Sequence, residues 1–188
     1  VRCFPENDFE FINTIENDYT LNLEVLKSKL DVVDALILVS PDNPTGSCLK
    51  YDEVLELLDY AKSKNKQVIF DESFMDFAVE SYTLINDDIL NTYPNLIVIK
   101  SISKSYGVPG LRLGILATSN VSYLNIINSN MPVWNINSFA EYFLQIIPLF
   151  KKDYVLACDM IKKERERFYS ELVKINKLKI YDSEANYF

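Results

Sequence analysis

Apolar residues follow two different periods along this chain, and their alternation predicts an α/β protein. Continuous apolar runs at residues 35–39 and 96–99, with a shorter one at 68–70 inside the predicted strand 67–71, are typical of strands buried on both faces. Between the first two strands in the chain, residues 51–64 carry apolar side chains every three or four positions, as the inner face of a helix does. Strands that alternate with helices favour βαβ units and a parallel sheet with helices on its faces.

The same pattern extends through the second half of the chain. It predicts a strand at 111–118, a helix near 119–128, a nearly continuous helix at 138–173 interrupted at Pro148, and short strands at 178–181 and 186–188. The change from alternating elements to one long helix indicates that the chain passes from a first structural unit into a second.

Composition excludes several classes of function. The 188 residues carry a net charge of −8, which argues against nucleic acid as a partner because phosphate backbones require a basic face. The chain has no histidine, so it cannot supply a Ser-His-Asp triad, a Cys-His pair or a histidine-ligated metal. Its three cysteines form no CxxC motif and indicate thiols in a reducing compartment. We expect no metal site.

Nothing in the sequence favours a membrane. The chain opens with no signal-peptide pattern, and its most apolar stretch, residues 139–150, is too short to cross a bilayer and contains Glu141. We therefore expect a cytoplasmic protein with no membrane partner.

Polar and charged side chains able to bind a ligand lie at or just after the ends of the predicted strands. They are Asn43, Asp71, Ser101, Ser103, Lys104 and Arg112. Each has an ordinary explanation by itself, as a turn residue, a strand-end carboxylate or a surface charge. However, carboxyl ends of parallel strands meet at one edge of a sheet, where ligands bind.

The chemistry of these residues suggests how they would act together. A partly buried Lys104 would become a nucleophilic amine able to form a Schiff base. Arg112 would present a fork of N–H donors to a phosphate, beside hydroxyls that precede Lys104. Asp71 would hold a proton on a pyridine ring and keep the ring an electron sink.

In this order, the motifs resemble the pyridoxal-phosphate enzymes of fold type I, specifically the class I/II aminotransferases. The motifs are Asn43-Pro-Thr-Gly46, Asp71-Glu72, Ser101-Ile-Ser-Lys104 and Gly110-Leu-Arg-Leu-Gly114. Residues 70–77, 132–138 and 183–188 look most like the branch containing histidinol-phosphate aminotransferase and threonine-phosphate decarboxylase.

The resemblance implies a cofactor, pyridoxal 5'-phosphate, and a role for each candidate residue. Lys104 would form the internal aldimine and shuttle a proton, Asp71 would pair with the ring nitrogen, Asn43 would bind the phenolic oxygen, and Ser101, Ser103 and Arg112 would bind the phosphate. Phe74 departs from the family, which often has a tyrosine there.

The resemblance also implies an architecture. Residues 1–150 would be part of a large domain, a three-layer sandwich with a mostly parallel sheet, and residues 151–188 an interdomain helix and the beginning of a small α+β domain. We expect an internal part of a longer protein, inactive by itself, whose full-length form is a homodimer.

Three functions are compatible with these residues. The first is transfer of an amino group between an amino acid and a 2-oxo acid. The second is decarboxylation of an amino acid resembling phosphothreonine, on the same scaffold. The third, from a different class, is a degenerate scaffold without catalysis.

Overall fold

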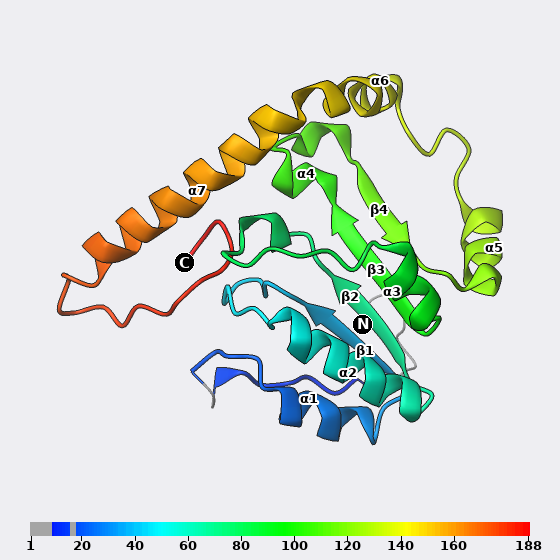
Figure 1. Cartoon of the computed structure of the whole chain (residues 1–188), viewed down its shortest axis with the longest axis horizontal. Coiled ribbons are helices and arrows are strands. Elements are labelled where there is room, and N and C mark those ends of the chain that lie inside the picture. Colours follow the sequence, from blue (N-terminus) through cyan, green and yellow to red (C-terminus); the bar gives the residue numbers. More distant parts are fainter. Residues whose placement is uncertain (1–8, 16–17) are drawn as a thin grey trace.

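A mixed four-stranded sheet organises the structure. In the computed structural model, which describes residues 9–15 and 18–188, its strands are β1 (Ala35–Val39), β2 (Gln67–Asp71), β3 (Leu96–Ser101) and β4 (Gly114–Ala117), adjacent in that order (Figure 1). The first three are parallel, and β4 runs antiparallel to β3. The predicted α/β fold with a mostly parallel sheet is confirmed.

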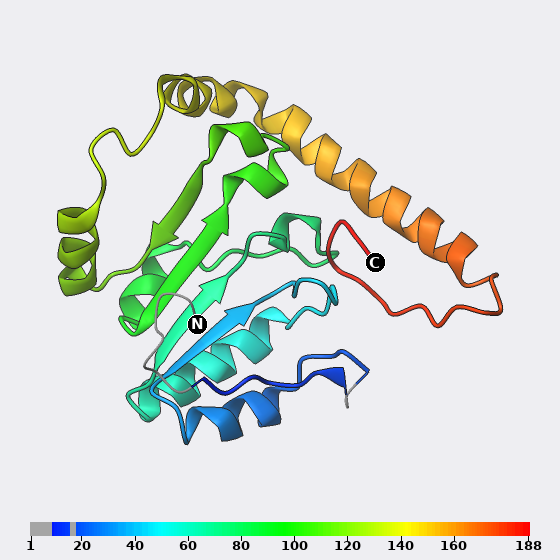
Figure 2. The same cartoon turned by 180° about the vertical axis from the view of Figure 1, so that it is seen from behind.

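Three helices cover one face of this sheet: α1 (Leu23–Leu30), α2 (Tyr51–Ser63) and α3 (Asp87–Thr92) (Figures 1 and 2). The sequence of α2 explains its position. The Glu53 carboxylate accepts the Lys50 backbone N–H at 2.8 Å and so caps the first turn. Apolar residues at helical spacing then give α2 a continuous buried side.

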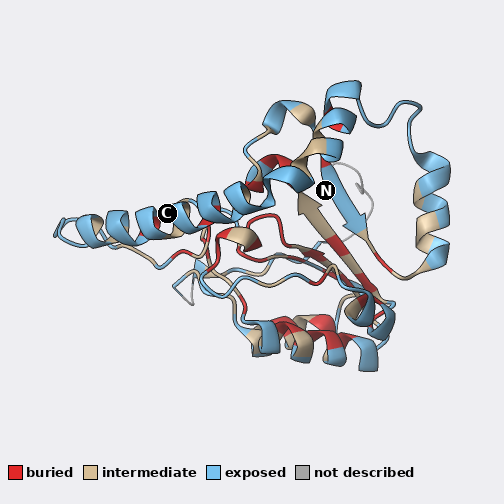
Figure 3. Cartoon of the chain, turned by 45° about the horizontal axis from the view of Figure 1, so that its top comes forward, coloured by how far each residue is buried: buried red, intermediate tan, exposed pale blue. Residues whose placement is uncertain are grey.

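The hydrophobic core lies between these helices and the sheet (Figure 3). Leu57 of α2 and Phe70 of β2 are completely buried there. Because side chains alternate along a strand, the next residues point to the opposite face. On that face, Ile37 of β1 is 65% exposed and Leu116 of β4 is 40% exposed. One face of the sheet is therefore packed and the other is open to solvent along both edge strands.

The remaining helices follow β2, in the case of η2, or β3 and β4. They are η2 (Met75–Phe77), α4 (Ile102–Ser105), η3 (Pro109–Leu111), α5 (Val121–Asn130), α6 (Ser138–Ile146), η4 (Ile147–Phe150) and α7 (Lys151–Leu172). The break predicted at Pro148 is confirmed, because η4 separates α6 from α7 and proline cannot continue an α-helical hydrogen-bond ladder. Helix α7 extends beyond the sheet and is exposed along most of its length (Figures 1 and 3).

Two of the predicted strands are wrong. Residues 178–181 and 186–188 are not in strands; they belong to an irregular segment that returns from the end of α7 towards the sheet (Figure 2). A strand requires a partner for its backbone, and this segment forms no ladder with the described residues. The strand expected at 111–118 begins only at Gly114, because η3 ends at Leu111 and Arg112 is left-handed, with φ 56°.

Among the described residues, no helix combines the length and the apolar character that crossing a membrane requires.

The two faces of the sheet predict opposite responses to truncation. Phe70→Ala should lower the free energy of unfolding by about 3–5 kcal/mol, because it leaves a cavity in a core that is completely packed. Ile37→Ala, in the neighbouring strand on the open face, should cost about 1 kcal/mol or less. Urea denaturation of both variants measures the difference. Equal losses would contradict the assignment of the packed face.

Candidate functional site

The register of the parallel strands brings three chain segments to one edge of the sheet. Val39, Asp71 and Ile99 lie side by side in β1, β2 and β3. The backbone N–H of Ser40 donates to the Asp71 carbonyl at 3.0 Å, and the N–H of Glu72 donates to the Ile99 carbonyl at 2.9 Å. The segments that leave these strands therefore begin next to one another, as the sequence predicted.

Asp71 stands at the centre of this edge and is half-buried. Its Oδ1 accepts the backbone N–H of Ser73 at 2.9 Å. The Ser73 hydroxyl in turn accepts the backbone N–H of Ser101 at 2.8 Å. The other carboxylate oxygen, Oδ2, has no protein partner among the described residues. Asp71 is thus oriented by one oxygen and available to a ligand through the other.

Ser73 is a site residue that the sequence reasoning missed. It is buried and links the end of β2 to the end of β3. Its position two residues after an aspartate is a known local signal, because an aspartate side chain often accepts the N–H two residues on.

Lys104 occupies α4, the single helical turn that continues β3. Its neighbours Ser103 and Ser105 are buried while Lys104 itself is exposed, so the partial burial expected for Lys104 is wrong. In so short a helix, the buried serines face the interior and leave Lys104 on the outer side. Its Nζ forms no ion pair with the described residues and lies 6.0 Å from the centroid of the Phe74 ring.

The three residues expected to bind a phosphate differ in availability. Ser101 is half-buried, and its hydroxyl has no protein hydrogen bond among the described residues. The buried Ser103 hydroxyl donates to the Leu113 carbonyl at 3.4 Å, so it faces the interior. Arg112 is exposed, and its Nη1 donates to the Pro109 carbonyl at 3.4 Å. The structure therefore offers Ser101 and Arg112 to a ligand and turns Ser103 away.

Asn43 lies exposed in the turn that follows β1. The turn is closed by Asp42, whose carbonyl accepts the Gly46 N–H at 2.8 Å and whose carboxylate accepts the Thr45 hydroxyl at 2.6 Å. The peptide bond before Pro44 is cis, as the sequence suggested. These contacts hold the backbone and leave the Asn43 side chain at the surface.

The last residues of the chain cover this turn, and we call Ser183–Phe188 the closing segment. The N–H of Glu184 donates to the Gly46 carbonyl at 2.8 Å. Arg165 of α7 is buried, and its Nη1 donates to the carbonyls of Phe77 and Ala185, both at 2.8 Å. Sequence reasoning recognised the closing segment but gave it no role; in the structure it joins α7 to the loops beside the site.

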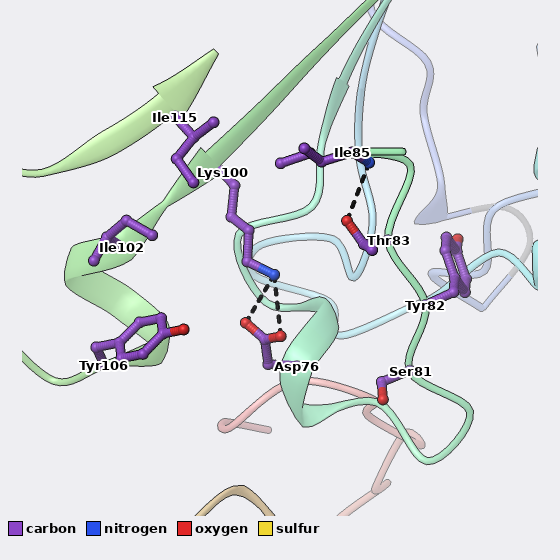
Figure 4. A pocket seen from close by; sticks show the side chains of 9 residues that line it. All are labelled: Asp76, Ser81, Tyr82, Thr83, Ile85, Lys100, Ile102, Tyr106 and Ile115. Carbon is purple, nitrogen blue, oxygen red and sulfur yellow. Dashed lines mark hydrogen bonds and ion pairs between the residues drawn. The ribbon is translucent and has the colours of Figure 1, made fainter. Parts of the chain in front are cut away.

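A hollow of about 420 Å³ lies on the packed face of the sheet (Figure 4). Lys100 of β3 reaches Asp76 there, with Nζ 3.0 Å from the carboxylate, and lies 3.6 Å from Glu72 Oε1. Burial raises the pKa of the Glu72 carboxyl, although hydrogen bonds from Thr83 and Leu84 and the charge of Lys100 oppose this. This cluster fixes the start of the loop that carries Phe74.

Comparison with known proteins assigns this arrangement to a family. The model of the family described as aminotransferase class I and II matches residues 2–188. The chain belongs to this family. Pyridoxal phosphate is accordingly its cofactor.

Two of the similar curated relatives are named as different enzymes. The chain is 34% identical over 185 residues to histidinol-phosphate aminotransferase of Flavobacterium psychrophilum, covering 94% of this chain and 51% of the relative. It is 32% identical over 181 residues to L-serine phosphate decarboxylase of Campylobacter jejuni, covering 92% and 45%. The chain spans about half the length of these two curated relatives.

A solved structure is similar to this chain in fold and is likewise about twice as long. A decarboxylase from Sulfurospirillum multivorans superposes with a TM-score of 0.80 at 30% identity, covering 93% of this chain and 51% of that one. The expected resemblance to class I/II enzymes is confirmed, and the expected fold of pyridoxal-phosphate-dependent transferases is confirmed with it.

The closing segment lies against the turn at Gly46. A Cβ built at Gly46 would lie 2.1 Å from Ser183 Oγ, and its φ of +74° disfavours other residues. Gly46→Ala should therefore displace the closing segment and lower the free energy of unfolding by about 1–3 kcal/mol. Hydrogen exchange of residues 183–188 and thermal denaturation measure both effects.

Gly110→Ala is the matched control, because a Cβ there meets nothing within 4 Å. It should leave exchange in the closing segment unchanged. If Gly46→Ala behaves like this control, the close approach of the two segments is not maintained in solution.

Proposed function

We propose that this chain carries the cofactor-binding and catalytic centre of a pyridoxal-phosphate-dependent aminotransferase, which transfers an amino group between an amino acid and a 2-oxo acid. The observation that supports this most strongly is the placement of Lys104 one helical turn beyond β3 while Ser73 joins the end of β3 to Asp71. A lysine amine and an oriented carboxylate thus lie at the ends of neighbouring strands.

The residues present fit the cofactor. Asp71 keeps one carboxylate oxygen without a protein partner, and the Ser101 hydroxyl and the Lys104 amine are similarly available within the described part of the chain. Asp71 would keep the ring nitrogen of the cofactor protonated, and Asn43 would bind the phenolic oxygen. Ser101 and Arg112 would bind the phosphate. Ser103 would assist by positioning α4, because its own hydroxyl is directed to Leu113.

When bound, pyridoxal phosphate supplies an electron sink for the electrons of a broken bond at the substrate α-carbon. Lys104 would attach the cofactor and, once the substrate has replaced it, move a proton at that carbon. Its exposed position leaves the amine accessible to both partners. Asp71 would maintain the positive charge on the ring that makes the sink effective, and Ser73 would maintain the direction of Asp71.

A second candidate is decarboxylation of a phosphorylated amino acid. The similarity to L-serine phosphate decarboxylase of Campylobacter jejuni, over 92% of this chain, favours it. Both reactions use the same amine and carboxylate, and they differ in which bond at the α-carbon is broken.

We also propose the larger organisation that the sequence suggested: residues 1–150 within a large cofactor domain, residues 151–188 as a connecting helix and the beginning of a small domain, and a homodimer in the cytoplasm. Exposed apolar side chains support association with another surface. Val133, Trp134, Phe139 and Leu149 are 79–93% exposed.

Borohydride reduction after incubation with pyridoxal phosphate tests the cofactor assignment. The native protein should acquire one stable adduct, located on Lys104 by peptide mapping, because this amine follows the strand end that carries the site. Lys104→Ala should lose it. Lys100→Met is the control, since Lys100 lies on the other face of the sheet in an ion pair. If Lys104 carries no adduct in the full-length protein either, the chain is a scaffold without this chemistry.

Product analysis separates the two candidate reactions. With histidinol phosphate and a 2-oxo acid, an aminotransferase should produce the amino acid that corresponds to the 2-oxo acid. With L-serine phosphate, a decarboxylase should release CO₂ and leave the amino group on its product. Carbon dioxide release at a higher rate than amino transfer would reject the first candidate in favour of the second.

A further inference from the structure

Tyr187 of the closing segment contacts both sides of the candidate site. Its hydroxyl donates to the Asp42 carbonyl at 2.7 Å, next to Asn43. Its ring meets the Phe74 ring edge to face, with centroids 5.1 Å apart and planes at 86°. Burial raises the pKa of the Tyr187 hydroxyl to about 12, so the hydroxyl remains a donor at neutral pH.

Phe74 connects this contact to the reactive amine. Lys104 Nζ lies 6.0 Å from the centroid of the Phe74 ring, while Tyr187 packs against the same ring. A lysine side chain has many rotamers, and a positively charged end is attracted to an aromatic face. Because Tyr187 fixes the Phe74 ring, it also limits the positions that the Lys104 amine adopts.

The position of Tyr187 is set by contacts outside the site. The neighbouring residues Glu184 and Ala185 are bound to the Gly46 carbonyl and to Arg165, respectively, and Ala185 is completely buried. The closing segment is consequently held by the turn after β1 and by α7, and neither contact involves the cofactor.

We propose that Tyr187 is a positioning residue, which fixes the Asn43 turn through its hydroxyl and the Lys104 amine through the ring of Phe74. This inference rests on the proposed function, because positioning matters only if Lys104 and Asn43 bind pyridoxal phosphate. The two contacts are separable by substitution. Tyr187→Phe removes the hydrogen bond and keeps the ring, whereas Tyr187→Leu removes both.

The experiment compares these variants with Tyr181→Phe in the native protein. Tyr181 is a matched control because it lies in the same returning segment but packs against Tyr19, with centroids 4.9 Å apart. Three quantities are measured: hydrogen exchange of residues 41–50, the dissociation constant of pyridoxal phosphate, and the fraction of borohydride-fixed cofactor carried by Lys104 rather than by other lysines.

Tyr187→Phe should accelerate exchange in residues 41–50 and weaken cofactor binding about fivefold, as loss of one hydrogen bond does, with the Lys104 fraction unchanged. Tyr187→Leu should in addition lower the Lys104 fraction about two- to fivefold, because the Phe74 ring loses its support. Tyr181→Phe should match the wild type in all three measurements. A purely structural contribution would accelerate exchange throughout the protein and leave the Lys104 fraction constant.

One result would overturn this inference and leave the proposed function intact. In it, the wild type is labelled at Lys104, and the Tyr187 variants bind the cofactor and are labelled at Lys104 to the same extent as the wild type. If Tyr187→Leu does not fold, Tyr187→Phe decides through its exchange and affinity. A wild-type protein that takes no cofactor on Lys104 rejects the proposed function, and this inference with it.

Discussion

The register of β1, β2 and β3 is the constraint on which both the core and the candidate site depend. Side chains alternate across a strand, so a slip of one residue would exchange the two faces. Phe70 would then leave the packed face and Asp71 would enter it. Burial of the apolar row thus selects the register that also sets Asp71 beside the turn after β1 and the helix after β3.

Backbone groups provide much of the further organisation. Ser73 joins the ends of β2 and β3 through an N–H that reaches Asp71 and a hydroxyl that receives the N–H of Ser101. The Asp42 carbonyl accepts from Gly46 within its own turn and from Tyr187 at the far end of the chain. Such bonds orient the site while leaving the ends of Lys104 and Arg112 available for chemistry.

The elements that could be predicted from the sequence are those whose pattern is local. Buried strands, the amphipathic α2, the break at Pro148 and the order of the turn motifs all depend on nearby residues. Side-chain direction in α4 could not be predicted, because one helical turn gives no periodicity to interpret, and Lys104 proved exposed while Ser103 is buried. The last residues alternate like strands yet have no ladder, since strand formation also requires a partner that a pattern cannot supply.

Helix α7 has a mechanical consequence that follows from a single buried side chain. At 22 residues it is about 33 Å long, and it is exposed along most of that length. Arg165 nevertheless binds one carbonyl after the loop that carries Phe74 and another in the closing segment. Because both carbonyls share one guanidinium nitrogen, a displacement of α7 at Arg165 would move Phe77 and Ala185 in the same direction. The helix is thereby coupled to the loop that carries Phe74 and to the closing segment that carries Tyr187 through one side chain.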